Sequence, residues 1–164
     1  MRFQHGLIAI GVLSIMLLFS ACTSAASGAP TVSADPIGGT WVEADVDGDA
    51  VIVPRTLVEE FVNLHFSVET GGSTLDFMAY VLDDEIQVRA NACPPCRSRG
   101  FALDGGILVC GACATTFDAR DGSGIAGACV DYPKAAVQHR TVNGAITMSL
   151  SDLVAAYDET LVAG

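Results

Sequence analysis

Basic residues are scarce in this sequence of 164 residues, in which eight lysines and arginines stand against 19 aspartates and glutamates. The net charge is −11, and no segment gathers Lys or Arg as a phosphate backbone requires. We therefore expect no nucleic-acid partner. An anionic bilayer would also repel such an acidic surface, so membrane attachment would need a lipid anchor.

The sequence also lacks an apolar run of the about 20 residues that a membrane span usually takes. The run at 7–19 is shorter, follows a weakly basic start and leads into Phe19-Ser20-Ala21-Cys22, which resembles the lipobox of bacterial lipoproteins. We predict a signal peptide over 1–22 and a lipid on Cys22. The lipid would hold the protein on the extracytoplasmic face of the cell membrane. An uncleaved N-terminal anchor helix is the alternative.

Small and polar residues over 23–40 predict a flexible tether, and 41–164 suffice for one domain. Short apolar or alternating stretches between turn signals predict a mainly β (α+β) fold. Strands are expected at 50–53, 65–69, 75–82, 85–90, 107–109 and 145–150, with turns at 71–72, 83–84, 105–106 and 142–144. Short helices are expected over 57–61, capped by Thr56, and over 152–161, capped by Ser151.

A hydrolytic site is missing from the pattern, since no Ser/His/Asp or paired-carboxylate arrangement stands out. Cysteine is instead concentrated: five of the six cysteines lie within 93–129. Cys93-Pro-Pro-Cys96 and Cys110-Gly-Ala-Cys113 are separated by thirteen residues, which is the spacing of a four-thiolate metal site. Each pair follows an expected strand, as two cysteine knuckles of a rubredoxin- or zinc-ribbon-like site require. We predict that Cys93, Cys96, Cys110 and Cys113 bind one metal centre.

The spacing alone leaves the occupant of this site open. Iron, an iron–sulfur cluster and structural zinc all accept four thiolates. Disulfides are common in an oxidising compartment, and Cys-Pro-Pro-Cys is also compatible with thiol–disulfide exchange. The fifth thiol, Cys129, is an alternative fourth ligand, a thiol beside the centre or a disulfide partner. Arg97 and Arg99 are candidates for lowering thiol pKa values or offsetting the charge of a cluster.

Several stretches of the sequence, in order, resemble one known family. They are 77–81 with 84–89, Asn91-Ala92-Cys93-Pro94-Pro95-Cys96, Gly100-Phe101, Leu108-Val109-Cys110-Gly111-Ala112-Cys113, Phe117, Gly127-Ala128-Cys129 with Pro133, and 142–153. They are similar to the membrane iron–sulfur proteins of the FtrD-like family. Members often carry Gly after the second cysteine pair and before the last cysteine, where this chain has Ala114 and Ala128.

The resemblance implies an iron–sulfur cluster or iron on Cys93, Cys96, Cys110 and Cys113, and a role for Cys129 in cofactor binding. It also implies an accessory in electron transfer or metal transport rather than an enzyme, with a membrane permease, an oxidoreductase or a cytochrome as partner. The competing hypothesis is a lipoprotein binding module held together by structural zinc or disulfides.

Overall fold

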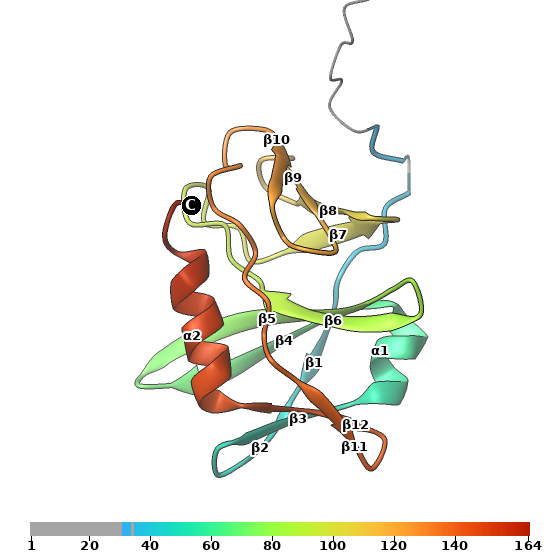
Figure 1. Ribbon diagram of the computed structural model, residues 1–164, viewed down its shortest axis with the longest axis vertical. Coiled ribbons are helices and arrows are strands. Elements are labelled where there is room, and N and C mark those ends of the chain that lie inside the picture. Colours follow the sequence, from blue (N-terminus) through green and yellow to red (C-terminus); the bar gives the residue numbers. More distant parts are fainter. Residues whose placement is uncertain (1–30, 34) are drawn as a thin grey trace, which may run out of the picture.

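The structure is a computed structural model that describes residues 31–33 and 35–164. These residues form three four-stranded sheets and two short helices (Figure 1). The elements are β1 (Thr40–Glu43), β2 (Asp45–Asp47), β3 (Ala50–Pro54), α1 (Arg55–Phe61), β4 (Asn63–Thr70), β5 (Ser73–Leu82), β6 (Glu85–Ala90), β7 (Phe101–Asp104), β8 (Ile107–Cys110), β9 (Thr116–Asp118), β10 (Gly124–Ala126), β11 (Arg140–Val142), β12 (Ala145–Ser149) and α2 (Leu150–Thr160). The expected β-rich fold with short helices is confirmed.

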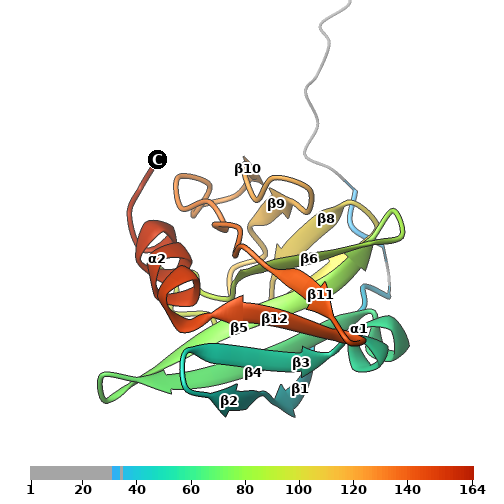
Figure 2. The same cartoon turned by 60° about the horizontal axis from the view of Figure 1, so that its bottom comes forward.

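The sheets form layers. A central sheet has the order β1-β4-β5-β6, and a lower sheet has the order β11-β12-β3-β2 (Figure 2). A small upper sheet, β10-β9-β8-β7, carries the cysteine loops. Only the pairing of β1 with β4 is parallel among the described strands.

Strand β5 explains why the stretch 75–82 is apolar almost throughout. Phe77 and Ala79 point into the core between the central and lower sheets. Met78, Tyr80 and Leu82 point into a second core beneath the upper sheet, which also contains the buried cysteines. Because successive side chains alternate between the faces of a strand, a strand covered on both faces needs no polar alternation. The upper core thus ties the cysteine loops to the central sheet.

Both helix caps predicted from the sequence are wrong by two residues. α1 begins directly after Pro54, which ends β3 and makes no side-chain cap, so Thr56 lies inside the helix. α2 is capped by Ser149, whose hydroxyl accepts a hydrogen bond from the Asp152 N–H, and Ser151 lies inside the helix. In both cases the helix starts where strand pairing ends, because β3 and β12 pair with each other up to these residues.

The predicted signal peptide, Cys22 and most of the predicted tether lie outside the described residues. The last part of the tether lies on the upper sheet, where Ile37 and Leu103 exchange two backbone hydrogen bonds of 2.8 Å. The Asn63 amide donates to the carbonyls of Ile37 and Phe101, and so joins this segment to the central sheet. Within 31–33 and 35–164, no helix is long and apolar enough to cross a membrane.

One row of side chains crosses the upper face of the central sheet, from Trp41 through His65 and Met78 to Arg89. His65 is 2% exposed, lies edge-on to the Trp41 ring, and neither ring nitrogen has a hydrogen-bond partner. Burial lowers its pKa from 6.5 to about 4. His65 is therefore neutral in the folded protein at neutral pH.

His65 is expected to make the fold sensitive to acid. In the unfolded chain the imidazole takes up a proton near pH 6.5, whereas in the folded chain it does so only near pH 4. The contribution of neutral His65 to the free energy of unfolding is complete above pH 6.5. About 3 kcal/mol of it is lost as the pH falls from 6.5 through 4. Urea unfolding between pH 7 and pH 4 should show a smaller loss in His65→Phe than in the wild type. Parallel pH profiles would contradict this.

Candidate metal centre

The two cysteine pairs form equivalent backbone knuckles. The N–H of Cys93 donates to the carbonyl of Ser98 at 3.0 Å, and the N–H of Cys110 donates to that of Thr115 at 2.9 Å. Each bond closes a loop onto the residue five positions further on. The residue after the second cysteine is left-handed in both loops, with φ +57° at Arg97 and +55° at Ala114. The second knuckle directly continues β8, and the first follows β6 after two residues.

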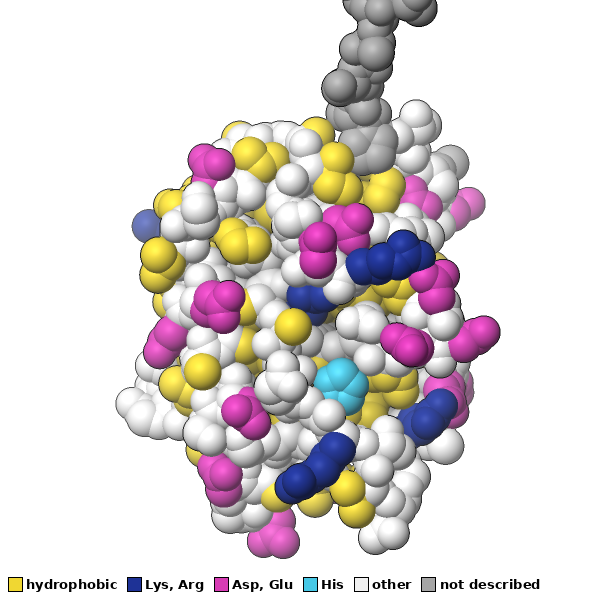
Figure 3. Space-filling view, in the orientation of Figure 1, with side chains coloured by type: hydrophobic (Ala, Val, Ile, Leu, Met, Phe, Trp, Pro, Cys, Tyr) yellow, Lys and Arg dark blue, Asp and Glu magenta, His cyan; other side chains and the backbone are white. Residues whose placement is uncertain are grey.

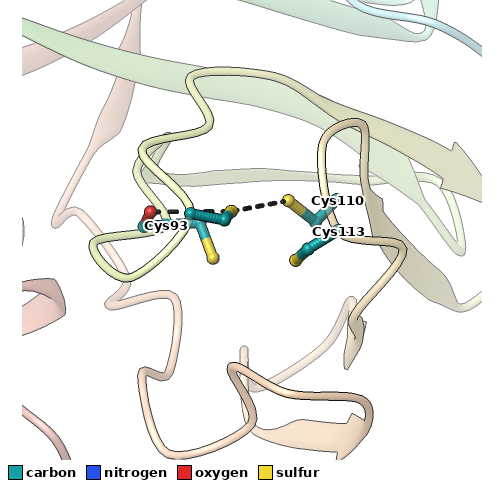
Figure 4. Close-up of side chains that lie close together, drawn as sticks. Cys93, Cys110 and Cys113 are labelled. Carbon is teal, nitrogen blue, oxygen red and sulfur yellow. Dashed lines mark hydrogen bonds between the residues drawn. The ribbon is translucent and has the colours of Figure 1, made fainter.

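The four sulfurs of these knuckles converge. The Sγ atoms of Cys93, Cys96, Cys110 and Cys113 all lie within 4.8 Å of one another. Figure 4 shows the two pairs facing each other across one space, where Cys96 Sγ and Cys110 Sγ are 3.6 Å apart. A tetrahedral ion with metal–sulfur bonds of about 2.3 Å has ligand sulfurs about 3.8 Å apart. The donor set and its spacing therefore fit a thiolate-bound metal.

The inner and outer ligands differ in exposure. Cys93 and Cys110 are 1% and 2% exposed, while Cys96 and Cys113 are half-buried. Burial raises the pKa of the Cys93 and Cys110 thiols. At Cys110 this is opposed by the Ser98 side chain and by the N–H groups of Cys113 and Ala112. Such N–H groups stabilise a thiolate whether or not a metal is bound to it.

Cys113 shows the opposite balance. Burial acts to raise its pKa, but hydrogen bonds from the Thr115 hydroxyl and backbone, with further interactions from Cys110 and Cys96, lower it to about 6. Thr115 is completely buried, and its Oγ1 lies 3.2 Å from Cys113 Sγ. The Thr115 hydroxyl thus accepts a hydrogen bond from the Cys113 thiol and can donate one to the Cys113 thiolate.

A third loop, which connects β10 to β11, brings Cys129 beside the knuckles. Cys129 Sγ lies 3.7 Å from Cys113 Sγ, and its N–H donates to Thr115 Oγ1 at 3.2 Å. Gly127 makes this approach possible: it has φ +119°, and a Cβ there would lie 2.6 Å from Thr115 Oγ1. Cys129 is not one of the four converging thiols, although it adjoins one of them. All five cysteines of the described part are free of disulfides.

These knuckles lie within a recognisable sequence family. Residues 42–159, most of the chain, match the family described as "Membrane iron-sulfur containing protein FtrD-like". The chain belongs to the FtrD-like family. The family is named for a membrane association and an iron–sulfur content, and the resemblance noted from the sequence is confirmed. No curated protein matches the chain.

Two solved structures show similarity to part of this FtrD-like protein. One is the complex of reduced oxygenase and oxidised ferredoxin in carbazole 1,9a-dioxygenase, with 16% identity and a TM-score of 0.45 over 52% of this chain and 80% of the matched chain. The other is the ferredoxin of Sphingomonas yanoikuyae B1, with 21% identity and a TM-score of 0.44 over 51% of this chain and 81% of the matched chain.

The two arginines beside the first cysteine pair make other contacts or face solvent. Arg99 pairs with the buried Asp76 and lies over the Trp41 ring, and Arg97 is exposed. The cation that does lie beneath the knuckles is Lys134, which sequence reasoning missed. Thr115 was also missed. Lys134 reaches the site only through packing, whereas Thr115 follows the ligand Cys113 by two residues and closes the second knuckle, a local signal that could have found it.

Ala114 is expected to strain the second knuckle slightly. An L-residue in the left-handed region costs roughly 1 kcal/mol more than glycine there. Ala114→Gly should therefore raise the free energy of unfolding by about this amount despite the added chain entropy. Urea unfolding of the metal-free protein measures it. Gly106→Ala, in open space without a left-handed φ, is a control for general glycine effects. A less stable Ala114→Gly protein would contradict the assignment.

Proposed function

We propose that this protein is a membrane-anchored, extracytoplasmic electron carrier whose iron or iron–sulfur centre is bound by Cys93, Cys96, Cys110 and Cys113. The observation that carries the proposal is the convergence of four thiols from two equivalent knuckles. Membership in a family described as membrane iron–sulfur proteins supports iron as the metal. When bound, thiolate-ligated iron supplies a one-electron redox couple.

The chain's own residues fit a carrier. Cys93 and Cys110 hold the inner side of the centre in the dry upper core, next to Phe101 and Phe117. Cys96 and Cys113 hold the outer side at the surface. The centre would thus be shielded on one side and open to electron exchange on the other. We assign Cys129 the role of a thiol beside the centre, since it lies outside the four-sulfur group.

The surface around Cys96 and Cys113 suits a docking partner. The stretches 91–103, 105–117 and 122–130, which bear the cysteines, contain no Asp or Glu, although the chain has 19 of them. Pro95, Ala112 and Ile125 are exposed there. Figure 3 shows hydrophobic side chains exposed on the upper part of the molecule. Apolar contact at the centre of an interface suits a redox protein that brings its own cofactor close. The partner we propose is a membrane oxidoreductase, permease or cytochrome.

The membrane attachment rests on Cys22 and the signal-like stretch before it. With a lipid on Cys22, the stretch 23–36 would be a tether of about 14 residues that lets the domain reach a membrane partner. Cys22→Ser should release the protein from the membrane fraction. Retention of this variant would instead support an uncleaved N-terminal helix.

Structural zinc is the second candidate function. It is favoured by the same compactness, since four sulfurs within 4.8 Å suit a single tetrahedral ion. A zinc site would hold the two knuckles together without redox activity.

Anaerobic purification with metal analysis, sulfide analysis and a visible spectrum on one sample separates these functions. We expect iron and charge-transfer absorption that changes on reduction. The ratio of acid-labile sulfide to iron then distinguishes a cluster from a single ion. A colourless protein with one zinc per chain would refute the carrier and establish the structural site.

A further inference from the structure

Lys134 is a completely buried cation beneath the metal centre. Its Nζ donates a hydrogen bond of 2.7 Å to the carbonyl of Ala92, the residue before the ligand Cys93. The ammonium also lies 4.5 Å from the centroid of the Phe117 ring and 5.3 Å from that of Phe101. These contacts place the charge in the same core that holds Cys93, Cys110 and Cys129.

No carboxylate compensates this charge within the described residues. The ion pairs there are Arg55–Glu59, Arg99–Asp76 and Arg120–Asp83, and none includes Lys134. A buried ammonium without a counter-ion is costly, so a fold rarely keeps one unless an anion lies near. Burial lowers the pKa of Lys134, and the influences that oppose this shift come from Cys93, Cys110, Cys129 and Cys96. The cysteines of this core become anionic neighbours of Lys134 when they bind a metal as thiolates.

The negative charge of the metal centre means that the nearby Lys134 cation would affect its reduction potential. Four thiolates bring a charge of −4, so the site stays anionic with a divalent or trivalent ion bound. Each electron that the centre accepts adds one negative charge near Lys134, with no bond made or broken. A fixed cation in a medium of low polarity therefore stabilises the reduced state more than the oxidised one.

We propose that Lys134 is the buried counter-charge of the metal centre and raises its reduction potential. This inference rests on the proposed electron-carrier function and adds a residue that sets its potential. Exposed Arg97, adjacent to Cys96, is a weaker candidate because solvent screens its charge. The position of the lysine beside the buried ligands, 41 residues downstream of Cys93, is decided only by the fold.

The test uses the full-length protein in detergent with its iron centre, and compares midpoint potentials of the wild type, Lys134→Met, Lys134→Gln and Arg97→Gln. Both Lys134 variants should reduce the equilibrium constant for reduction at least tenfold, which is about 59 mV for one electron. Arg97→Gln should shift it much less. Lys134→Gln keeps a donor for the Ala92 carbonyl but lacks the charge. Wild-type potential in Lys134→Gln, or an equal shift in Arg97→Gln, would overturn the proposal.

Thermal melting of the metal-free proteins separates charge compensation from a structural role. Removing an uncompensated buried charge should leave metal-free Lys134→Gln, which keeps a donor for the Ala92 carbonyl, at least as stable as the wild type. A variant that is less stable, or that does not fold, means that Lys134 supports the fold and contradicts the proposal.

Failure of the electron-carrier function would look different, because the wild type itself would then contain zinc and no iron. In that case, the rate at which a chelator removes the zinc still tests the counter-charge. Faster loss from both Lys134 variants than from the wild type supports it, and equal rates contradict it.

Discussion

Cys110→Ser is expected to yield a colourless protein with iron at background level. Cys110 is 2% exposed and is the last residue of β8. The pairing of β8 with β7 and the knuckle hydrogen bonds therefore fix the position of its sulfur. A serine hydroxyl in the same place is a poor ligand at neutral pH because it does not ionise there, whereas a thiol does so readily on binding a metal. Iron content and visible absorption of protein purified without oxygen measure the effect.

Cys129→Ser is the matched control for this change. Cys129 is buried to a similar degree, at 3% exposure, and its sulfur lies 3.7 Å from that of Cys113. We expect this variant to keep its iron and colour, because four other thiols complete the site. Loss of iron in Cys129→Ser with retention in Cys110→Ser would mean that Cys129 is a ligand and that the set of four is wrong.

Arg89→Met is expected to destabilise the protein strongly and to loosen the centre. The Arg89 guanidinium is 2% exposed and donates to Tyr80 Oη and to the backbone carbonyls of Arg120, Asp121 and Lys134. It thereby clamps the segment that carries Cys129 and Lys134 to the central sheet. Without it these four acceptors lose a buried partner, which should lower the free energy of unfolding by at least about 3 kcal/mol.

Urea unfolding and the rate of metal loss to a chelator measure the two effects of Arg89→Met. Arg120→Gln is the control, because the Arg120 side chain lies on the same segment but is exposed and pairs with the exposed Asp83. An exposed pair contributes at most about 1 kcal/mol. If the two variants were equally stable, the clamp would have little importance and the segment would be held by its apolar contacts.

The helix caps show where local pattern stops being sufficient. Ser149 and Ser151 both precede apolar helical residues, and either hydroxyl could cap. Ser149 does so because Ser149 pairs with Ala50 in the lower sheet and the Leu150 N–H donates to the Asp49 carbonyl. The end of the strand, which is a long-range contact, thus sets the start of the helix. The two-residue error at Thr56 has the same cause.

The sequence by itself determined six of the twelve strands in the described residues, the turns and the four converging thiols. It did not predict β1, β2, β7, β9, β10 and β11, because strands of three or four residues carry too short a pattern. Turn residues such as Gly71 and Asn143 act locally, and two Cys-x-x-Cys pairs after strands dictate two knuckles whatever surrounds them. The tertiary structure alone decided which groups surround the sulfurs. Arg89 and Lys134 come from different elements and meet near the site only because the loop between β10 and β11 folds back onto the central sheet, and the same fold brings the Cys129 N–H to Thr115 of the second knuckle. Ligand spacing is a property of neighbouring residues, whereas the electrostatic environment of a metal depends on contacts between distant ones.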